Sequence, residues 1–109
     1  MSDIKNAYYA GLLDGEGSFT LKRQNATDRQ RARYTPLVRC SMTHEETIRS
    51  IHDYFGVGQV HRKVKSNPKW KLQWEWIVYS REALAVVNRI LPYMITKRAD
   101  ALRIVEHYG

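Results

Sequence analysis

Apolar and polar residues alternate along four stretches of this chain, which is the pattern of β-strands with one buried face and one open face. In the last stretch, Trp74, Trp76 and Val78 share one face, so the tryptophans are predicted to pack in a core rather than to stack on a ligand. A turn signal at residues 66–68 separates the third stretch from the fourth. The predicted strands cover residues 18–23, 34–42, 57–64 and 71–79.

Apolar residues at helical spacing, together with residues that favour helix ends, predict four helices around these strands. The clearest has Thr43 as its predicted N-cap and Glu46 completing a capping box, and it ends at Gly56. Gly15 is predicted to end the first helix, and Ser80 to cap the third. The predicted helices cover residues 3–13, 44–55, 81–91 and 97–107.

The predicted elements follow the order helix, hairpin, helix, hairpin, helix, helix. This order favours an α+β domain in which one four-stranded antiparallel sheet carries its helices on the apolar face. A chain of 109 residues is long enough for one domain with one core, so residues 1–109 are predicted to form a single domain.

The chain is basic, and its positive charge is concentrated in two places. There are 18 Lys and Arg residues against 11 Asp and Glu, which gives a formal net charge of +7. Residues 22–39 carry six basic side chains against one acid, and residues 61–71 carry five against none. Because these segments occupy matching places in the two predicted hairpins, a nucleic-acid partner is favoured over a merely solvated surface.

The polar face of the predicted sheet alternates hydrogen-bond donors and charged side chains. The major groove of DNA admits a two-stranded ribbon, and Arg, Lys and Gln are side chains that read base edges there. Basic residues in the loops between strands are predicted to contact phosphates, which position the DNA without specifying its sequence. The predicted DNA-binding residues are Thr20, Lys22, Gln24, Arg29, Arg31, Arg33, Arg39, Ser41, His61, Lys63, Lys65, Lys69, Lys71, Gln73 and Glu75.

The segment from Tyr8 to Phe19 joins a helix bearing small residues to an acid. Gly11 and Gly15 are four residues apart, so they leave a flat stripe along which two helices can approach closely. Glu16 lies where such a contact would end, and two copies would bring two carboxylates together. Crowded carboxylates repel each other unless a cation lies between them, so the segment predicts a homodimer and a metal site.

Cysteine content and hydropathy bear on where the protein works. Cys40 is the single cysteine, and its place in an apolar alternation predicts a buried thiol. No apolar run approaches the ~20 residues of a membrane helix, and the first ten positions show no secretion signal. The sequence therefore predicts an intracellular protein of the cytoplasm or an organelle matrix, which is not secreted.

Three blocks of the chain resemble the LAGLIDADG homing endonucleases. Residues 9–17 read Tyr-Ala-Gly-Leu-Leu-Asp-Gly-Glu-Gly, which is similar to the signature of that family. Residues 56–60 and 91–102 resemble the family's turn into the third strand and the segment before its last helix, and the blocks keep the family's order. A single signature in a chain of this length resembles the single-motif, homodimeric branch.

The resemblance implies an intron-encoded nuclease that works as a two-fold dimer with its signature helices at the interface. Such an enzyme uses Mg²⁺, for which other divalent cations can substitute, to cut both strands of a long, pseudo-palindromic double-stranded DNA site. Pseudo-palindromy follows because two identical halves read similar half-sites. The dimer-interface residues that the resemblance implies are Tyr8, Gly11, Leu12 and Gly15.

Individual residues match positions of the family's active site. Glu16 matches the metal-binding acid, where many members have Asp, and Gly17 follows it with a carbonyl that can also bind metal. Lys97 matches a basic residue near the scissile phosphate, with the adjacent Arg98 as a competing candidate. A charged residue that faces water at the start of a helix is the alternative for Lys97. His44 lies near the place of a polar residue that organises catalytic waters, although an exposed histidine in a capping box is the alternative. Asp14, the other signature acid, is expected to stabilise the helix end and turn.

Two other kinds of function stay open at this point. A non-cleaving protein of the same fold would be an RNA maturase that binds intron RNA, or a DNA-binding regulator. A purely structural basic module, such as a ribosome-associated protein, would bind nucleic acid without sequence preference. The presence of both Glu16 and Lys97 favours the nuclease.

Overall fold

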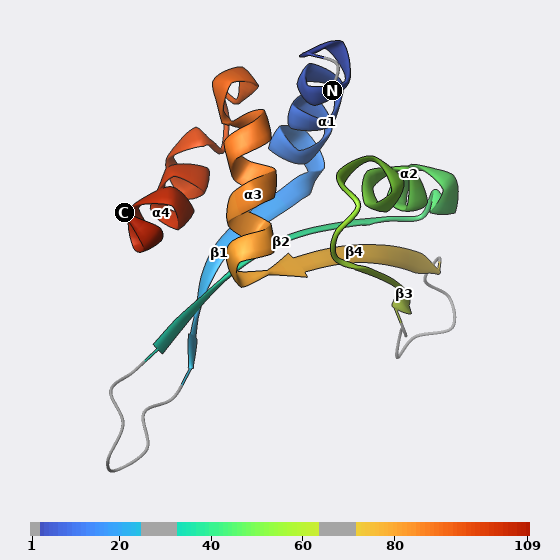
Figure 1. The fold of residues 1–109 in the computed structure, drawn as a ribbon. Helices are drawn as coiled ribbons and strands as arrows, with labels where there is room; N and C mark the ends of the chain where they lie inside the picture. Colours follow the sequence, from blue (N-terminus) through green and yellow to red (C-terminus); the bar gives the residue numbers. More distant parts are fainter. Residues whose placement is uncertain (1–2, 25–32, 64–71) are drawn as a thin grey trace.

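The computed structural model of the protein describes residues 3–24, 33–63 and 72–109 (Figure 1). Their helices and strands follow one another in the order that the sequence predicts. The elements are α1 (Asp3–Glu16), β1 (Gly17–Gln24), β2 (Arg33–Met42), α2 (Glu45–Phe55), β3 (Gln59–Lys63), β4 (Gln73–Tyr79), α3 (Ser80–Ile90), the 3₁₀ turn η1 (Leu91–Tyr93) and α4 (Arg98–Tyr108).

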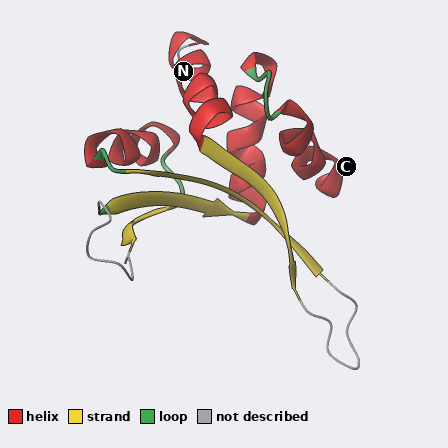
Figure 2. Cartoon of the chain, turned by 180° about the vertical axis from the view of Figure 1, so that it is seen from behind, coloured by secondary structure: helices red, strands yellow, loops and turns green. Residues whose placement is uncertain are grey.

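The strands form one antiparallel sheet in the order β1-β2-β4-β3, so the two hairpins join through β2 and β4. Figure 1 shows all the labelled helices on one side of this curved sheet, and Figure 2 shows the same layers from behind. The other side of the sheet is left open. The predicted α+β class, with a four-stranded antiparallel sheet and helices on one face, is confirmed.

The core lies between the helices and the sheet face that the alternation predicted. Val38 and Val78 are at most 1% exposed, and Trp76 is fully buried. The indole N–H of Trp76 donates to the carbonyl of Val57 at 3.0 Å, which satisfies its polar atom. Trp74 packs partly against the same core. The interpretation of the tryptophans as core residues is therefore confirmed.

The first helix is longer than predicted, because it continues through Gly15 to Glu16. The chain breaks from helix into strand at Gly17 instead. A Cβ atom on Gly17 would lie 2.7 Å from the carbonyl oxygen of Leu13, closer than real Cβ atoms come. Glycine is thus required at this turn by the close approach of backbone, and Gly15 does not end the helix.

Two of the predicted caps are wrong. The N-cap of α2 is His44 rather than Thr43, and the His44 ring takes the place of the predicted capping box. The residue before α3 is Tyr79, which makes no side-chain cap, while Ser80 is already the first helical residue with a φ of 57°. Because β4 passes directly into α3, Ser80 must adopt a left-handed conformation, a backbone demand that the side-chain pattern did not reveal. The predicted stop at Gly56 is confirmed by its left-handed φ of 71°.

The open face of the sheet is not uniformly exposed. Leu37 and Ile77 are 5% and 7% exposed, and Glu75 is 6% exposed. These residues lie on β2 and β4, the two central strands, so each has a neighbouring strand on both sides. None of the helices in the described ranges has the length and hydropathy of a membrane span.

Candidate functional site

The junction of α1 and β1 places a carboxylate and a carbonyl at one corner of the domain. Glu16 ends α1 with an exposed side chain, and within the described part of the chain its carboxylate has no hydrogen-bond or ion-pair partner. Gly17 follows as the buried first residue of β1. An acid at a helix C-terminus is disfavoured by the helix dipole, so a nearby positive charge would stabilise it.

Asp14, one turn before this corner, holds the start of α4. Its carboxylate accepts the backbone N–H groups of Ile95 and Thr96 at 2.9 Å and that of Lys97 at 2.6 Å. Burial acts to raise the pKa of this carboxyl, but the three N–H donors and the charge of Lys97 outweigh it and hold the pKa below its ordinary value. Asp14 therefore stabilises a turn, as expected, although the turn is the one before α4 rather than the end of its own helix.

We expect Asp14→Asn to destabilise the fold by about 1.5–3 kcal/mol at neutral pH, the usual contribution of hydrogen bonds to a charged group. Because the folded pKa lies below the unfolded value of about 3.9, this stabilisation is complete above that pH and is lost as the pH falls through the folded pKa. Urea unfolding should show a wider gap between wild type and variant at about pH 7 than at about pH 3, where the unfolded carboxyl is mostly protonated. Asp100→Asn, at an exposed site in α4, is the control, and a pH-independent gap would contradict this role for Asp14.

Lys97 brings a cation to the corner that Glu16 and Gly17 form. Its ammonium donates a hydrogen bond to the Gly17 carbonyl and lies 3.5 Å from the carbonyl oxygen of Gly15. Asp14 holds the backbone of the same lysine. The end of α1 thus holds both the main chain and the ammonium group of Lys97. Three predicted site residues from opposite ends of the sequence, Glu16, Gly17 and Lys97, therefore lie at one corner of the domain.

Cys40 lies beside this corner, opposite Gly17 in the pairing of β1 with β2. Burial raises the pKa of its thiol to about 11, the negative charge of Glu16 adds to the rise, and the positive charge of Lys97 opposes it. The thiol therefore stays protonated near neutral pH and is a poor nucleophile. The prediction of a buried thiol is confirmed.

The oxygens at this corner decide whether it can hold a metal ion. A carboxylate at Glu16 and a carbonyl at Gly17 are hard donors of the kind that Mg²⁺ and Ca²⁺ prefer. The described ranges contain no group of three or more His, Cys, Asp or Glu side chains placed to hold a metal. One chain therefore offers one acid here, since Asp14 is already bonded to backbone. The Gly17 carbonyl already accepts from the Lys97 ammonium, so Glu16 is the hard donor left for a cation here. A hard divalent cation would take most of its remaining oxygens from water and from other molecules.

His44 lies at the N-terminus of α2. Its Nδ1 accepts the backbone N–H of Thr47 at 3.3 Å and lies 2.7 Å from the Thr47 hydroxyl oxygen. The side chain is exposed, and its contacts in the described ranges do not include Glu16 or Lys97. The structure thus gives His44 a capping role, and a catalytic role stays a prediction.

Polar residues predicted to contact DNA line the open face of the sheet, where the register places them on the side away from the helices. The exposed members are Thr20, Lys22, Arg33, Arg39 and His61. The half-buried members are Ser41, Lys63 and Gln73, and the buried member is Glu75. The predicted residues outside the described part of the structure are Arg29, Arg31, Lys65, Lys69 and Lys71, together with the side chain of Gln24.

A group of hydrogen-bonded and ion-paired side chains on this face, which we call the Glu75 cluster, consists of Ser41, His61, Lys63 and Glu75. The Glu75 carboxylate lies 3.0 Å from the Ser41 hydroxyl and 3.0 Å from Nε2 of His61, and Nζ of Lys63 lies 3.7 Å away. Ser41 and His61 are the two residues paired directly with Glu75 across β2 and β3. Strand alternation placed these residues on one face, but their bonding depends on the register of three strands.

One side of α1 exposes apolar and small residues in a line, which we call the α1 stripe: Ile4, Tyr8, Gly11 and Gly15. Ile4 is 82% exposed and Tyr8 is 59% exposed. A Cβ atom on either glycine would meet nothing within 4 Å. The spacing of these four positions places them on one helix face. Leu12, also predicted at an interface, packs partly against the core.

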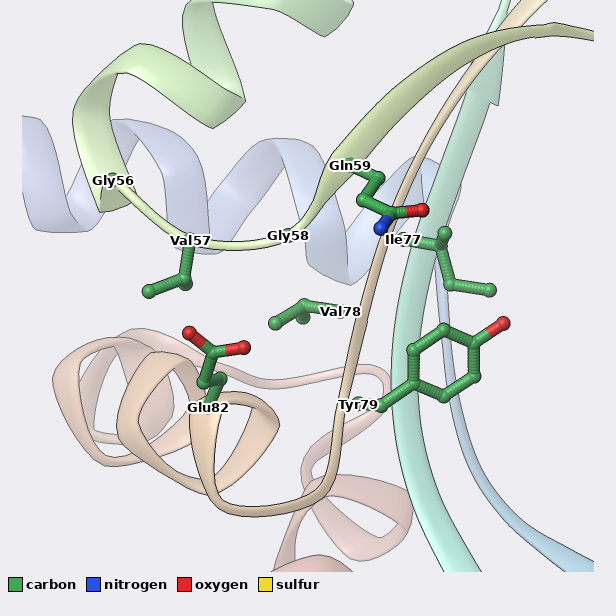
Figure 3. Close-up of a pocket in the computed structure, with 8 residues that line it drawn as sticks. All are labelled: Gly56, Val57, Gly58, Gln59, Ile77, Val78, Tyr79 and Glu82. Atoms are coloured by element: carbon green, nitrogen blue, oxygen red, sulfur yellow. The ribbon is translucent and has the colours of Figure 1, made fainter.

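A cavity of about 260 Å³ lies between the loop after α2, the end of β4 and the first turn of α3 (Figure 3). Its lining includes one carboxylate, Glu82, and none of the predicted site residues. Gly58 in this loop has a φ of 89°, and a Cβ on it would lie 2.7 Å from both the Ile77 carbonyl and the Trp76 indole nitrogen. Close packing therefore explains Gly58, whereas Gly56 is explained by its left-handed φ at the end of α2.

The sequence from residue 9 to residue 105 matches the family model for LAGLIDADG endonucleases. The chain belongs to the LAGLIDADG endonuclease family, which confirms the resemblance seen in its sequence. No curated protein matches the chain significantly.

Several solved structures of homing endonucleases have a similar fold. I-CvuI in complex with the I-CreI target, with Mg present and the DNA not cleaved, has a TM-score of 0.78 and 21% identity, over 94% of this chain and 64% of that chain. The archaeal, intron-encoded I-Vdi141I complexed with DNA has a TM-score of 0.76 and 22% identity, over 95% and 66%. I-CpaMI bound to uncleaved DNA has a TM-score of 0.75 and 23% identity, over 93% and 34%.

The chain thus spans about two-thirds of the length of I-CvuI and I-Vdi141I, and about a third of the length of I-CpaMI. At these identities the likeness establishes the fold that the chain shares with them. Nearly all of this chain takes part in each superposition, so the common fold includes the helix that carries Glu16 and the open sheet face.

Proposed function

We propose that the protein is a sequence-specific homing endonuclease that acts as a homodimer and hydrolyses both strands of a long, pseudo-palindromic DNA site with a divalent metal. The observation that carries this proposal is that Glu16, Gly17 and Lys97 come together at the end of α1. The same helix exposes the α1 stripe, along which a second copy can pack. Membership of the LAGLIDADG endonuclease family supports the nuclease activity, and the DNA complexes of I-CvuI and I-Vdi141I support DNA as the partner.

In the proposed dimer, the two α1 helices pack along their stripes. Gly11 and Gly15 have room for a partner backbone, and Ile4 and Tyr8 would bury apolar surface that is exposed in one chain. Glu16 follows directly after the stripe, so a two-fold axis along it brings the two acids together. The same axis makes the two halves of the DNA target similar in sequence.

A divalent cation, Mg²⁺ in the cell, would be held by the Glu16 carboxylate, and by the Gly17 carbonyl once the Lys97 ammonium releases its hydrogen bond to that oxygen. When bound, such an ion lowers the pKa of a coordinated water and stabilises the leaving oxygen. The structures of I-CvuI on DNA in the presence of Mg and of Ca support a hard divalent cation for this fold. The second acid at the site would come from the partner copy.

The chain's own residues would prepare the site for a phosphate. Lys97 keeps a positive charge beside Glu16, and Asp14 fixes its backbone so that little reorganisation is needed as charge develops in the transition state. His44 would order water near the site. The Nε2 atom of His44 is available for this role because Nδ1 is the atom that faces Thr47.

The open sheet face would lie in the major groove and read the half-site. Exposed Lys22, Arg33 and Arg39 lie on it, and the two basic segments of the sequence flank its strands. Contacts to phosphates would make binding weaken steeply with salt, with a slope of about −0.9 for each phosphate neutralised. DNA as the substrate also fits the intracellular location predicted from the sequence.

A library of double-stranded DNA with randomised palindromic half-sites tests the proposal in the presence of Mg²⁺. We expect a small set of related sites to be cut in both strands, and we expect sedimentation to show a dimer. Tight, selective binding without cleavage would overturn the nuclease activity and favour a DNA-binding regulator. Weak binding that unrelated DNA competes away equally well would favour a structural basic module instead.

A further inference from the structure

Glu75 is an acid on a face whose other polar residues, in the described ranges, are basic or neutral, and it is covered. Its side chain is 8% exposed, whereas those of His61 and Lys63 are 48% and 42% exposed. An exposed carboxylate on this face would repel phosphates, and a covered one must have its hydrogen bonds made within the protein. Ser41 donates to the Glu75 carboxylate, Nε2 of His61 lies 3.0 Å from it, and Lys63 forms a longer ion pair with it. These partners lie on the two flanking strands, so the role of Glu75 is directed at its neighbours.

The contact between Glu75 and His61 determines where the imidazole carries its proton. An ionised carboxylate can only accept hydrogen bonds, so Nε2 of His61, at 3.0 Å, must be the protonated nitrogen. In the neutral ring this leaves Nδ1 as an acceptor. About half of the His61 side chain is exposed on the open face, so the acceptor can be presented to a ligand in the groove.

We propose that Glu75 is a positioning residue that selects the base read by His61. With its proton held on Nε2, His61 accepts from the exocyclic amino group of cytosine or adenine on the strand that it contacts. Guanine and thymine present acceptors or a methyl group in the major groove, so they do not satisfy Nδ1. The inference rests on the proposed function, because it concerns how the same sheet face reads DNA.

Lys63 is the second basic side chain held by Glu75. Its ammonium lies 3.7 Å from the carboxylate, so Glu75 restrains a flexible cation beside the reading histidine. Removing the negative charge would free this cation for phosphates at any sequence. Glu75 thereby acts for selectivity twice, once through the tautomer of His61 and once by limiting non-specific attraction.

The first test uses the full-length protein without DNA. Glu75→Gln keeps the shape of the side chain but replaces an obligate acceptor with an amide that can also donate. Side-chain ¹⁵N NMR at about pH 8 should show His61 protonated on Nε2 in wild type and as a mixture of tautomers in Glu75→Gln. His61→Ala assigns the signals. Glu106→Gln, an equal charge change at an exposed site on α4, should leave the tautomer unchanged. A wild-type proton on Nδ1, or identical tautomers in Glu75→Gln, would overturn the proposal.

The second test measures base preference at every position of the selected target. In Glu75→Gln, discrimination should fall about tenfold at one base pair in each half-site, the pair that His61→Ala also affects. At that base pair, the double variant should lose no more discrimination than His61→Ala alone, because the two residues act there as one unit. Loss at every position, or at none, while wild type remains selective would overturn this inference alone. A wild type without base preference at any position would overturn the proposed function and this inference with it.

Discussion

Glu16→Gln protein should bind the target DNA of the wild type and fail to cut it. The substitution keeps the size of the side chain but removes the charge that would hold the cation at the end of α1. A metal ion contributes several kcal/mol of transition-state stabilisation, so we expect cleavage to slow by about 10²-fold or more. Because the Glu16 side chain is exposed, thermal unfolding of the variant should match that of wild type.

Single-turnover cleavage with Mg²⁺, together with DNA binding in the absence of divalent ions, separates chemistry from affinity for Glu16→Gln. Glu106→Gln is the matched control, since it makes the same charge change at an exposed position of α4. Equal rates in Glu16→Gln and wild type would remove Glu16 from the proposed metal site and leave the nuclease activity to other residues.

Gly11→Leu should give a folded protein that no longer dimerises or cuts DNA. A Cβ at position 11 meets nothing within 4 Å in its own chain, and leucine favours helix over glycine by roughly 0.5–1 kcal/mol, so the single chain should fold at least as well. In a close helix pair the added side chain must push the partner backbone away. Such overpacking costs about 1–3 kcal/mol, which weakens the dimer by up to about 10²-fold.

Analytical ultracentrifugation across a concentration series measures this effect, and cleavage assays on the same samples show whether activity follows the dimer. Ala85→Leu adds a comparable side chain to an exposed position of α3 and should leave the dimer intact. If Gly11→Leu protein sediments as a dimer and cuts DNA, the α1 stripe is not the interface.

Sequence patterns predicted the strands well because each strand buries one face against the helices. On β1, buried Phe19 lies between exposed Ser18 and Thr20, and this period of two survives in the folded state. On β4 the burial no longer alternates, because Glu75 and Ile77 on the open face are also covered. The helix ends were harder, because they depend on contacts that a local pattern does not contain. Gly17 is required by the Leu13 carbonyl, and Ser80 takes a left-handed conformation because β4 runs directly into α3.

In the candidate site too, the sequence revealed individual residues but not the long-range contacts that they make. The family resemblance pointed to Glu16, Gly17 and Lys97. The three N–H donors of Asp14 lie 81 to 83 residues away in the sequence, so no spacing rule could show that it holds the turn before α4. The sequence likewise did not show that Glu75 is buried. Strand alternation predicts on which side of the sheet a side chain lies, but it does not predict that residues of the two flanking strands cover it.

The buried residues on the open face set a limit on redesigning the protein for new targets. Leu37 and Ile77 are nearly as covered as the core on the opposite side, so truncating either should cost about 2–5 kcal/mol. Exposed positions such as Lys22 and Arg33 can be varied at a cost of roughly 0.5 kcal/mol or less. Combinatorial libraries confined to the exposed positions should therefore keep most members folded. Libraries that also vary Leu37 and Ile77 should contain many unfolded members, which are lost before specificity can be selected.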